Sequence, residues 1–195
     1  MRFGILGGSF DPIHLGHLKI AEFCQKELNL DFILFIPAGN PPHKSVFADY
    51  QHRFDMVKLA IKGHKNSRIS DIEKSSSSPT YTLNTLKKTK KLYPNDEIFF
   101  FIGEDNVSEI QTWHNYKELF HYARFVVLSR NVESRKFFKY LNYFDKLQFL
   151  NMPKIDISSS MIRNNLAKNL SIDGFVPKVV ENYIRKNKLY RKGER

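Results

Sequence analysis

The chain has 195 residues, of which 42% are hydrophobic and 26% are charged, values typical of a globular protein with a sizeable core. No apolar run approaches the roughly 20 residues that span a membrane, the start of the chain lacks a secretory signal pattern, and a single cysteine excludes an internal disulfide. We therefore expect one cytoplasmic domain over residues 1–195. The formal charge of +11 predicts anionic partners, either nucleic acid or nucleotides and pyrophosphate.

The first predicted strand is the apolar run Phe3–Leu6, which ends at Gly7 and Gly8. The missing Cβ atoms predict a tight turn where the backbone can approach a ligand closely. A helical pattern follows, and His14 and His17 share one face at its start because they are three residues apart. Two imidazoles, free N–H groups and the positive end of a helix dipole then meet at the carboxyl end of a strand, which predicts a phosphate site.

Other interpretations of this segment have less support. Zinc needs three or four ligands, and the only cysteine, Cys24, fits the apolar side of the helix. The glycines do not match G-x-G-x-x-G, and no G-x-x-x-x-G-K-[ST] follows, so the segment lacks both the dinucleotide-binding and the P-loop motif.

Further predicted strands and helices alternate along the chain. Strands are expected at residues 32–36, 67–72, 97–102, 125–128 and 147–150, and helices from 49 to about 62, from 80 or 82, after 114, over 132–144, and from 176 to 190. The Phe-rich run at 97–102 is expected to be buried on both faces. This alternation predicts an α/β fold with a doubly wound parallel sheet, and a ligand site across the carboxyl ends of its strands.

A serine cluster at residues 158–160 is expected to open another helix. Its hydroxyls can cap free N–H groups or help to bind an oxyanion there. Arg163, one turn into the helix, can reach the same anion with a planar fork of donors.

The segment G-G-S-F-D-P-I-H-L-G-H, residues 7–17, resembles the H-x-G-H loop of the nucleotidyltransferase superfamily, in the form used by bacterial nicotinate-nucleotide adenylyltransferases. The resemblance continues through P-P-H-K at 41–44, P-T-Y-T-L-N-T-L at 79–86, G-E-D at 103–105 with W-H at 113–114, and I-S-S-S-M-I-R at 157–163. It implies a Rossmann-like fold and an enzyme that joins ATP and nicotinate mononucleotide to give deamido-NAD and pyrophosphate.

The resemblance also implies roles for individual residues. The catalytic side chains would be His14, His17, Lys44 and Arg163. ATP would contact Gly7, Gly8, Ser9, Phe10, Gly16, Gly103, Asp105, Ile157, Ser158, Ser159 and Ser160. Nicotinate mononucleotide would contact Tyr81, Thr82, Thr85, Trp113 and His114. The mononucleotide phosphate would attack the α-phosphorus of ATP without a general base, and Mg²⁺ would be carried with ATP rather than held in a carboxylate cage.

Several of these residues also have simpler explanations. From chemistry alone Lys44 is better explained as a solvated loop lysine, and only the resemblance reverses this preference. Asp105 could also be a helix cap, although we favour the functional role. Arg53 stands at the family's R-x-x-M position, but a surface arginine or an internal ion pair explains it as well. A lone tryptophan such as Trp113 more often belongs to the core.

Two residues depart from the family pattern, Asn84 at a usual Asp and His114 at a usual aromatic residue. The alternatives within the superfamily are a nicotinamide-mononucleotide adenylyltransferase, a pantetheine-phosphate adenylyltransferase and a cytidylyltransferase. From another class, a basic nucleic-acid-binding module would leave the paired-histidine loop unexplained. We expect small-molecule partners, ATP and nicotinate mononucleotide, and neither a membrane nor a nucleic acid.

Overall fold

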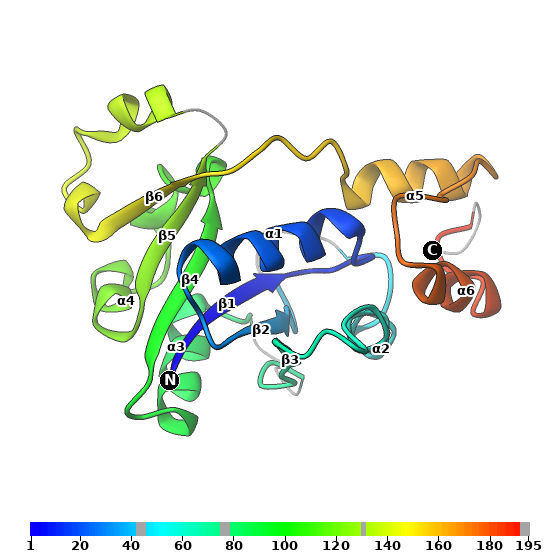
Figure 1. Ribbon diagram of the computed structural model, residues 1–195, viewed down its shortest axis with the longest axis horizontal. Helices are drawn as coiled ribbons and strands as arrows, with labels where there is room; N and C mark the ends of the chain where they lie inside the picture. The colour runs from blue at the N-terminus through cyan, green and yellow to red at the C-terminus, as the bar shows by residue number, and fades with distance from the viewer. Residues whose placement is uncertain (42–45, 75–78, 130–131, 192–195) are drawn as a thin grey trace.

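The computed structural model describes residues 1–41, 46–74, 79–129 and 132–191. Its centre is a six-stranded, fully parallel sheet with the order β3-β2-β1-β4-β5-β6 (Figure 1). The strands are β1 (Arg2–Gly8), β2 (Phe32–Pro37), β3 (Ser67–Ile69), β4 (Glu97–Gly103), β5 (Arg124–Ser129) and β6 (Leu147–Asn151). The order reverses between β1 and β4, which places a ligand crevice at the carboxyl ends of these two central strands. The predicted doubly wound α/β fold is confirmed.

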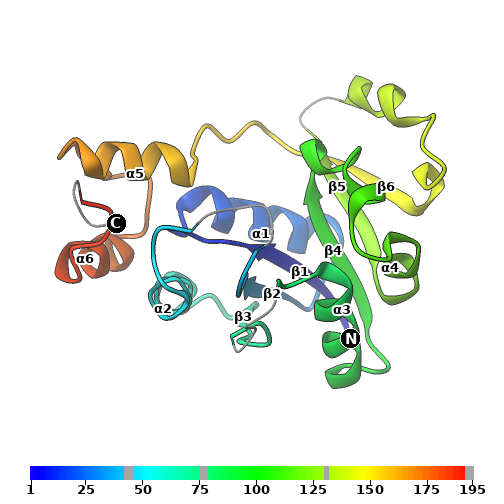
Figure 2. The same ribbon diagram turned by 180° about the vertical axis from the view of Figure 1, so that it is seen from behind.

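Helices cover both faces of the sheet. They are α1 (Leu15–Glu27), α2 (Tyr50–Ala60), α3 (Thr82–Leu92), α4 (Tyr116–Tyr122), α5 (Ser159–Ala167) and α6 (Lys178–Lys186), with short 3₁₀ helices η1 (Glu104–Asn106), η2 (Ile110–Thr112), η3 (Val132–Phe138) and η4 (Phe144–Lys146). Helix α1 lies over one face, and α3 and α4 over the other (Figures 1 and 2). Helices α5 and α6 stand beyond the carboxyl end of β1, joined to β6 by an extended segment (Figure 1).

Strand β4 joins the two halves of the apolar core. Phe99 and Phe101 pack in the cluster under α1 and α2, whereas Ile98, Phe100 and Ile102 pack in the cluster under α3 and α4. Successive residues of a strand point to opposite faces, so a continuous apolar run fills both layers at once. This confirms that the 97–102 strand is buried on both sides.

Three predicted elements differ from those found: the strand at 67–72, the helix at 132–144 and the closing helix at 176–190. The third strand ends at Ile69 instead of residue 72, where the polar residues Ser70 and Asp71 begin a turn. The segment 132–144 is not one helix, because η3 ends at Phe138 and a turn follows. This segment is also less peripheral than expected, since Tyr143 is buried and its hydroxyl donates to a backbone oxygen 2.8 Å away.

The closing helix is also shorter than predicted. Helix α6 ends at Lys186 instead of residue 190, and Lys188 and Tyr190 adopt left-handed backbone conformations, with φ of 55° and 65°. The chain therefore leaves the helix axis and turns back toward the sheet. Apolar periodicity does not reveal such a reversal, because Leu189 and Tyr190 remain partly buried after the helix has ended.

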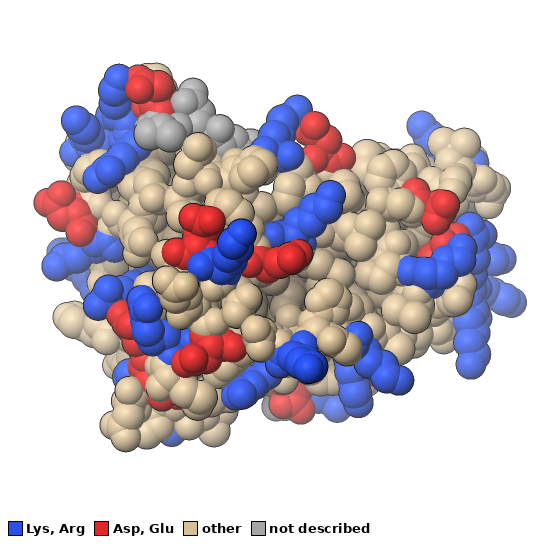
Figure 3. Space-filling model, in the orientation of Figure 1, with Lys and Arg blue, Asp and Glu red and all other residues tan. Residues whose placement is uncertain are grey.

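Positive charge gathers at the α6 end of the molecule (Figure 3). Two of the cations on α6, Lys178 and Arg185, form ion pairs with the buried carboxylate of Glu181. Lys87 on α3 is paired with Glu118 on α4. These three cations are therefore at least partly neutralised by neighbouring carboxylates. Within the described ranges, no helix is long and apolar enough to cross a membrane.

Candidate active site

The two histidines lie at the head of α1. His14 is the N-cap residue, and its ring stacks on that of His17 with centroids 3.7 Å apart. The His17 Nδ1 atom accepts a hydrogen bond from the His14 backbone N–H at 3.2 Å. With Nδ1 acting as an acceptor, a neutral His17 carries its proton on Nε2. The ring therefore presents one fixed N–H donor.

Burial keeps both imidazoles neutral near neutral pH. It lowers the pKa of His14 from 6.5 to about 4. Burial, followed by the neighbouring His14, lowers the pKa of His17 well below its ordinary value. The Nδ1 atom of His14 is buried and has no hydrogen-bond partner within the described part of the chain. This atom lies against Gly16, where an added Cβ would be 2.8 Å away, so it faces the head of α1.

The turn after β1 forms at Phe10 and not at the glycines. Gly7 and Gly8 are the last two residues of β1, and Phe10 has a positive φ of 47°. An added Cβ at either glycine would meet nothing closer than 3.5 Å, so internal packing does not require glycine there. Their small size leaves the end of the strand open on the side of the crevice.

Two of the residues expected at ATP are used in packing. The Phe10 side chain is buried against Phe35 and the edge of the His17 ring. A Cβ added at Gly16 would lie 2.8 Å from His14 Nδ1, so this glycine admits the imidazole beside it. Contacts of these residues with ATP stay predictions.

Arg53 is not a surface residue, and it forms no ion pair with any of the described residues, which were the two simpler explanations that the sequence suggested. It is 1% exposed, and its guanidinium donates to the carbonyl oxygens of Ser9 and Ala38, both at 2.8 Å, and of Ala48 at 3.0 Å. The charge is thus satisfied by backbone dipoles from three segments around the crevice. Arg53 holds the loops after β1 and β2 together.

Asp11 is a second centre of hydrogen bonding, and sequence reasoning placed it only in a loop. Its buried carboxylate accepts from the backbone N–H groups of Phe47 at 2.6 Å and Ala48 at 3.1 Å. It also accepts from the hydroxyl of Tyr190 at 2.7 Å. This one side chain joins the turn after β1, the start of α2 and the segment after α6.

The serine motif lies directly against the histidine loop. Ser158 is the N-cap of α5, and its hydroxyl accepts a backbone N–H at 3.2 Å, as the capping prediction requires. The Ser159 hydroxyl donates to the carbonyl oxygen of Pro12 at 2.9 Å, across 147 positions of sequence. Ile157 packs against the core. The two motifs that sequence reasoning assigned to ATP are therefore adjacent.

Arg163 reaches the same loop from one turn further along α5. Its guanidinium donates to the carbonyl oxygen of Asp11 at 2.6 Å and to the Ser160 hydroxyl at 3.3 Å. It also lies over the ring of Phe47, 4.3 Å from the centroid. Binding of a phosphate by this side chain stays a prediction, but its position beside the histidine loop fits it.

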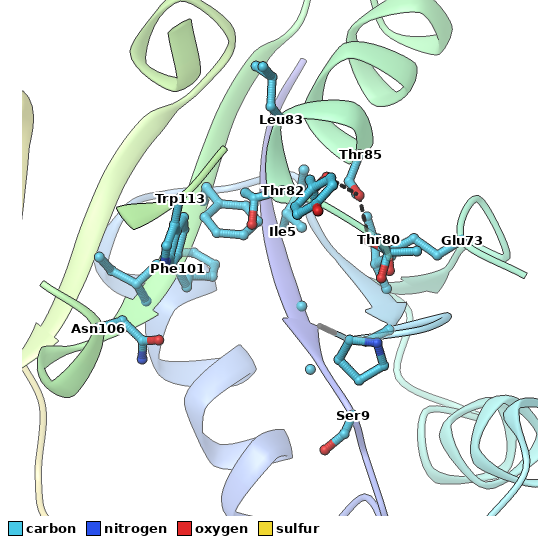
Figure 4. Close-up of a pocket in the computed structure, with 18 of the residues that line it drawn as sticks. Ile5, Ser9, Glu73, Thr80, Thr82, Leu83, Thr85, Phe101, Asn106 and Trp113 are labelled. Atoms are coloured by element: carbon cyan, nitrogen blue, oxygen red, sulfur yellow. Dashed lines mark hydrogen bonds between the residues drawn. The ribbon is translucent and has the colours of Figure 1, made fainter. Parts of the chain in front are cut away.

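A cavity of about 330 Å³ opens at the carboxyl ends of β1 and β4. Phe101, Asn106 and Trp113 form one side, and Glu73 and Thr85 face them from the other (Figure 4). Gly7, Gly8 and Ser9 line the end that meets the histidine loop. The cavity and the histidine loop therefore adjoin at the end of β1, and we call them the ring end and the phosphate end of one cleft.

The residues assigned to nicotinate mononucleotide come together in this cavity. Tyr81, Thr82 and His114 line it, and the rings of Tyr81 and His114 stack with centroids 4.9 Å apart. Helix α3 begins at Thr82, and first-turn N–H groups lack partners within a helix. Thr82 and Leu83 thus offer backbone donors where the helix meets the cavity. Trp113 lines the cavity and is only partly buried, so it is not a core tryptophan.

Glu73 was missed by sequence reasoning. Its carboxylate accepts from the Gly39 backbone N–H at 3.0 Å and from the Thr85 hydroxyl. Gly39 must be glycine, because an added Cβ would lie 2.1 Å from the Glu73 carbonyl oxygen. The available signal was positional: Glu73 follows the third strand, at the same sheet edge as the other ligand loops. The Thr85 hydroxyl is consequently engaged inside the protein.

The G-E-D segment contributes differently than expected. Asp105 is exposed and does not line the cavity, and its carboxylate folds over Gly103, where an added Cβ would lie 2.2 Å from Oδ1. Asn106 and Glu109, which sequence reasoning did not select, line the cavity instead. The assignment of Asp105 to ATP stays a prediction. Lys44 lies outside the described residues.

The parallel sheet, the switch point between β1 and β4 and the paired-histidine loop define a nucleotidyltransferase-like nucleotide-binding protein. The cytidylyltransferase-like family model matches residues 5–165. The chain is 39% identical to a probable nicotinate-nucleotide adenylyltransferase of Carboxydothermus hydrogenoformans, covering 97% of this chain and 98% of that protein. It is also 39% identical to one of Thermus thermophilus, covering 98% and 100%. The chain therefore belongs to the nicotinate-nucleotide adenylyltransferase family.

Solved structures give the same relationship. The chain resembles the Plasmodium falciparum nicotinic acid mononucleotide adenylyltransferase complexed with NaAD, with a TM-score of 0.78 and 27% identity over 97% of both chains. A second structure of that enzyme, complexed with APC, has a TM-score of 0.76 and the same identity, over 97% of this chain and 96% of that chain.

Proposed function

We propose that this protein transfers the adenylyl group of ATP to nicotinate mononucleotide, forming deamido-NAD and releasing pyrophosphate. The observation that carries the proposal is the fixed Nε2–H donor of His17, set by the 3.2 Å bond from the His14 N–H to Nδ1 at the end of β1. A cavity of about 330 Å³, large enough for a pyridine ring, adjoins it. Relatives of this chain bear the name of this activity over nearly their whole length.

The reaction is a direct displacement. A 5′-phosphate oxygen of the mononucleotide forms a bond to the α-phosphorus of ATP, and the bond from that phosphorus to the bridging oxygen breaks. Pyrophosphate leaves with the electron pair. Because the attacking oxygen is already an anion, no side chain needs to remove a proton. The protein contributes alignment and donors aimed at the charge that develops on the transferred group.

The residues at the phosphate end suit these two tasks. His17 would donate its Nε2–H to an α-phosphate oxygen, and His14, whose ring stacks on that of His17, would also contact the phosphates. Arg163 and the serines at the start of α5 would hold the β- and γ-phosphates. Lys44 would add a further cation.

Mg²⁺ would enter with ATP. No group of three carboxylate, imidazole or thiolate side chains that could hold a metal occurs among the described residues, so the ion would keep phosphate oxygens and water as its ligands. Bound there, it would neutralise phosphate charge. We place the reaction in the cytoplasm, with which the buried free thiol of Cys24 is compatible.

The cavity would select the pyridine ring substituent. The backbone donors of Thr82 and Leu83 suit a carboxylate, which accepts from two N–H groups with charge assistance. A carboxamide would turn its NH₂ toward one of them and leave that donor unpaired, at a cost of roughly 1–3 kcal/mol. This corresponds to a preference for nicotinate over nicotinamide mononucleotide of about tenfold to a hundredfold in kcat/KM.

The test is pyrophosphate release from ATP with nicotinate mononucleotide, nicotinamide mononucleotide or pantetheine phosphate, and from CTP with each of them. We expect turnover with ATP and the first acceptor, and a clear preference over the second. Equal use of both acceptors would contradict the proposed selection, and turnover only with pantetheine phosphate or CTP would assign the protein to a sister activity. Salt-dependent retention on DNA without any turnover would favour the nucleic-acid-binding alternative.

A further inference from the structure

Tyr190 follows α6 and returns to the loop after β1. Its hydroxyl donates to Asp11 Oδ1 at 2.7 Å, a contact between residues 179 positions apart. Tyr190 has a φ of 65°, and Lys188, two residues earlier, has a φ of 55°. Left-handed conformations are unfavourable for residues with a side chain and persist where surrounding contacts require them. The contact with Asp11 is such a requirement.

We propose that Tyr190 is a positioning residue for adenylyl transfer, which acts through Asp11 to hold the histidine loop in its working geometry. The proposal rests on the proposed function for its effect on turnover, but not for the contact itself. Tyr190 would not touch the substrates.

The hydrogen bonds around Asp11 show how the effect would be transmitted. The backbone N–H of Phe47 donates to Oδ2 of the Asp11 carboxylate, whereas the backbone N–H of Ala48 and the Tyr190 phenol both donate to Oδ1. The Asp11 carbonyl oxygen also accepts from Arg163. Only two residues separate Asp11 from His14, so a shift of Asp11 displaces the head of α1, where both imidazoles are fixed.

The phenol is suited to a permanent donor role. Burial and the adjacent Asp11 carboxylate raise the pKa of Tyr190 far above its ordinary value, while Arg163 and Arg53 oppose this only in part. The hydroxyl therefore keeps its proton, and the bond to Asp11 survives throughout the pH range in which the enzyme would work. These are the charged groups that face it from α2, α5 and the loop after β1.

Helix α6 does not depend on Tyr190 for its attachment. Val180 and Ile184 are buried in the core. The Tyr183 hydroxyl donates to Asp55 of α2 at 3.2 Å and lies 3.0 Å from a ring nitrogen of His52. The same part of the chain thus carries two tyrosines with similar hydrogen-bonding roles, of which only Tyr190 reaches the histidine loop. Tyr183 is the matched control.

The experiment compares Tyr190→Phe with Tyr183→Phe. We expect Tyr190→Phe to lower kcat about tenfold, since small displacements of reacting groups have large effects, with a Tm close to that of the control. Tyr183→Phe should keep kcat within about twofold, because the bonds it loses lie between α6 and α2. Wild-type kcat in Tyr190→Phe, or equal losses of kcat in both variants, would overturn the proposal.

A second readout is independent of turnover. Imidazole titration followed by NMR should give a higher pKa for His14 in Tyr190→Phe than in the wild type, because a loosened loop admits water to the ring. Tyr183→Phe should titrate as the wild type does. Unchanged titration in Tyr190→Phe would count against the positioning role even if the protein had another activity. A shifted His14 titration in Tyr190→Phe, in a protein that shows no adenylyl transfer, would contradict the proposed function. It would still support the structural link from Tyr190 to the histidine loop.

Discussion

The two ends of the cleft are built in opposite ways. At the phosphate end, hydrogen bonds from separate segments converge on the loop after β1, through Arg53, Asp11, Ser159 and Arg163. At the ring end, aromatic and aliphatic side chains alternate with polar ones such as Glu73 and Asn106 around a cavity, with the stack of Tyr81 on His114 at one wall. Directional bonds fix the places of individual atoms, whereas apolar surfaces stabilise whatever covers them in proportion to area.

This contrast teaches where each kind of catalytic contribution arises. In adenylyl transfer, charge develops around the α-phosphorus, so the donors that we assign to the phosphate end would act on the transition state. The pyridine ring is remote from the bond that breaks, so its contacts act equally on ground and transition states and appear mainly in KM. Three predictions test this division, from the largest expected effect to the smallest.

Acid should lower the stability of the fold through the buried imidazole of His14 at the phosphate end. The pKa of His14 falls from 6.5 in the unfolded chain to about 4 in the fold, so the unfolded state binds more protons between these values. The free energy of unfolding is therefore unaffected by His14 above pH 6.5. It decreases by roughly 2–4 kcal/mol through this group as the pH falls toward 4. Urea unfolding at several pH values measures this loss. His14→Asn should lack the part that His14 contributes, while His17, whose pKa burial also lowers, keeps its own part.

The control for this measurement is His121→Ala, which removes an exposed imidazole on α4. Its stability should follow the wild-type dependence on pH. If His14→Asn and the wild type lose stability in parallel, the buried neutral His14 is not the source of the acid sensitivity.

His17→Ala should reduce kcat by roughly a hundredfold or more, the scale for loss of one preorganised donor at the transition state. KM for nicotinate mononucleotide should change little, and the fold should persist because α1 keeps its packing on the sheet. Steady-state kinetics and circular dichroism measure both. His121→Ala again serves as the control, and near-normal turnover in folded His17→Ala would return His17 to a structural role.

Trp113→Ala should act on the ring end. We expect KM for nicotinate mononucleotide to rise about tenfold while kcat is largely kept, because the loss is one of stacking area. Phe137→Ala removes an aromatic ring that is 74% exposed on η3 and should leave both constants unchanged. A fall in kcat like that of His17→Ala, with unchanged KM, would contradict the division between the two ends.

Local patterns were sufficient to predict much of the fold. The apolar run of β4 must fill both sides of a sheet, and the spacing of His14 and His17 puts both rings on one face, as found. The head of α1 and the cap at Ser158 were also predicted from neighbouring residues. The predictions were wrong where apolar residues continue beyond the regular element, as at residues 132–144 and after α6.

The sequence by itself determined the class of fold and the paired histidines at the head of α1, because both depend on short-range periodicity or a contiguous motif. Only the tertiary structure decided what holds them in place. The Arg53 guanidinium binds backbone carbonyl oxygens, and no pattern of side chains in the sequence predicts such partners. Glu73 and Tyr190 form hydrogen bonds with residues 34 and 179 positions away in the sequence. Such partners are chosen by the packing of distant segments, since a buried polar group must be satisfied by whatever backbone the fold brings to it.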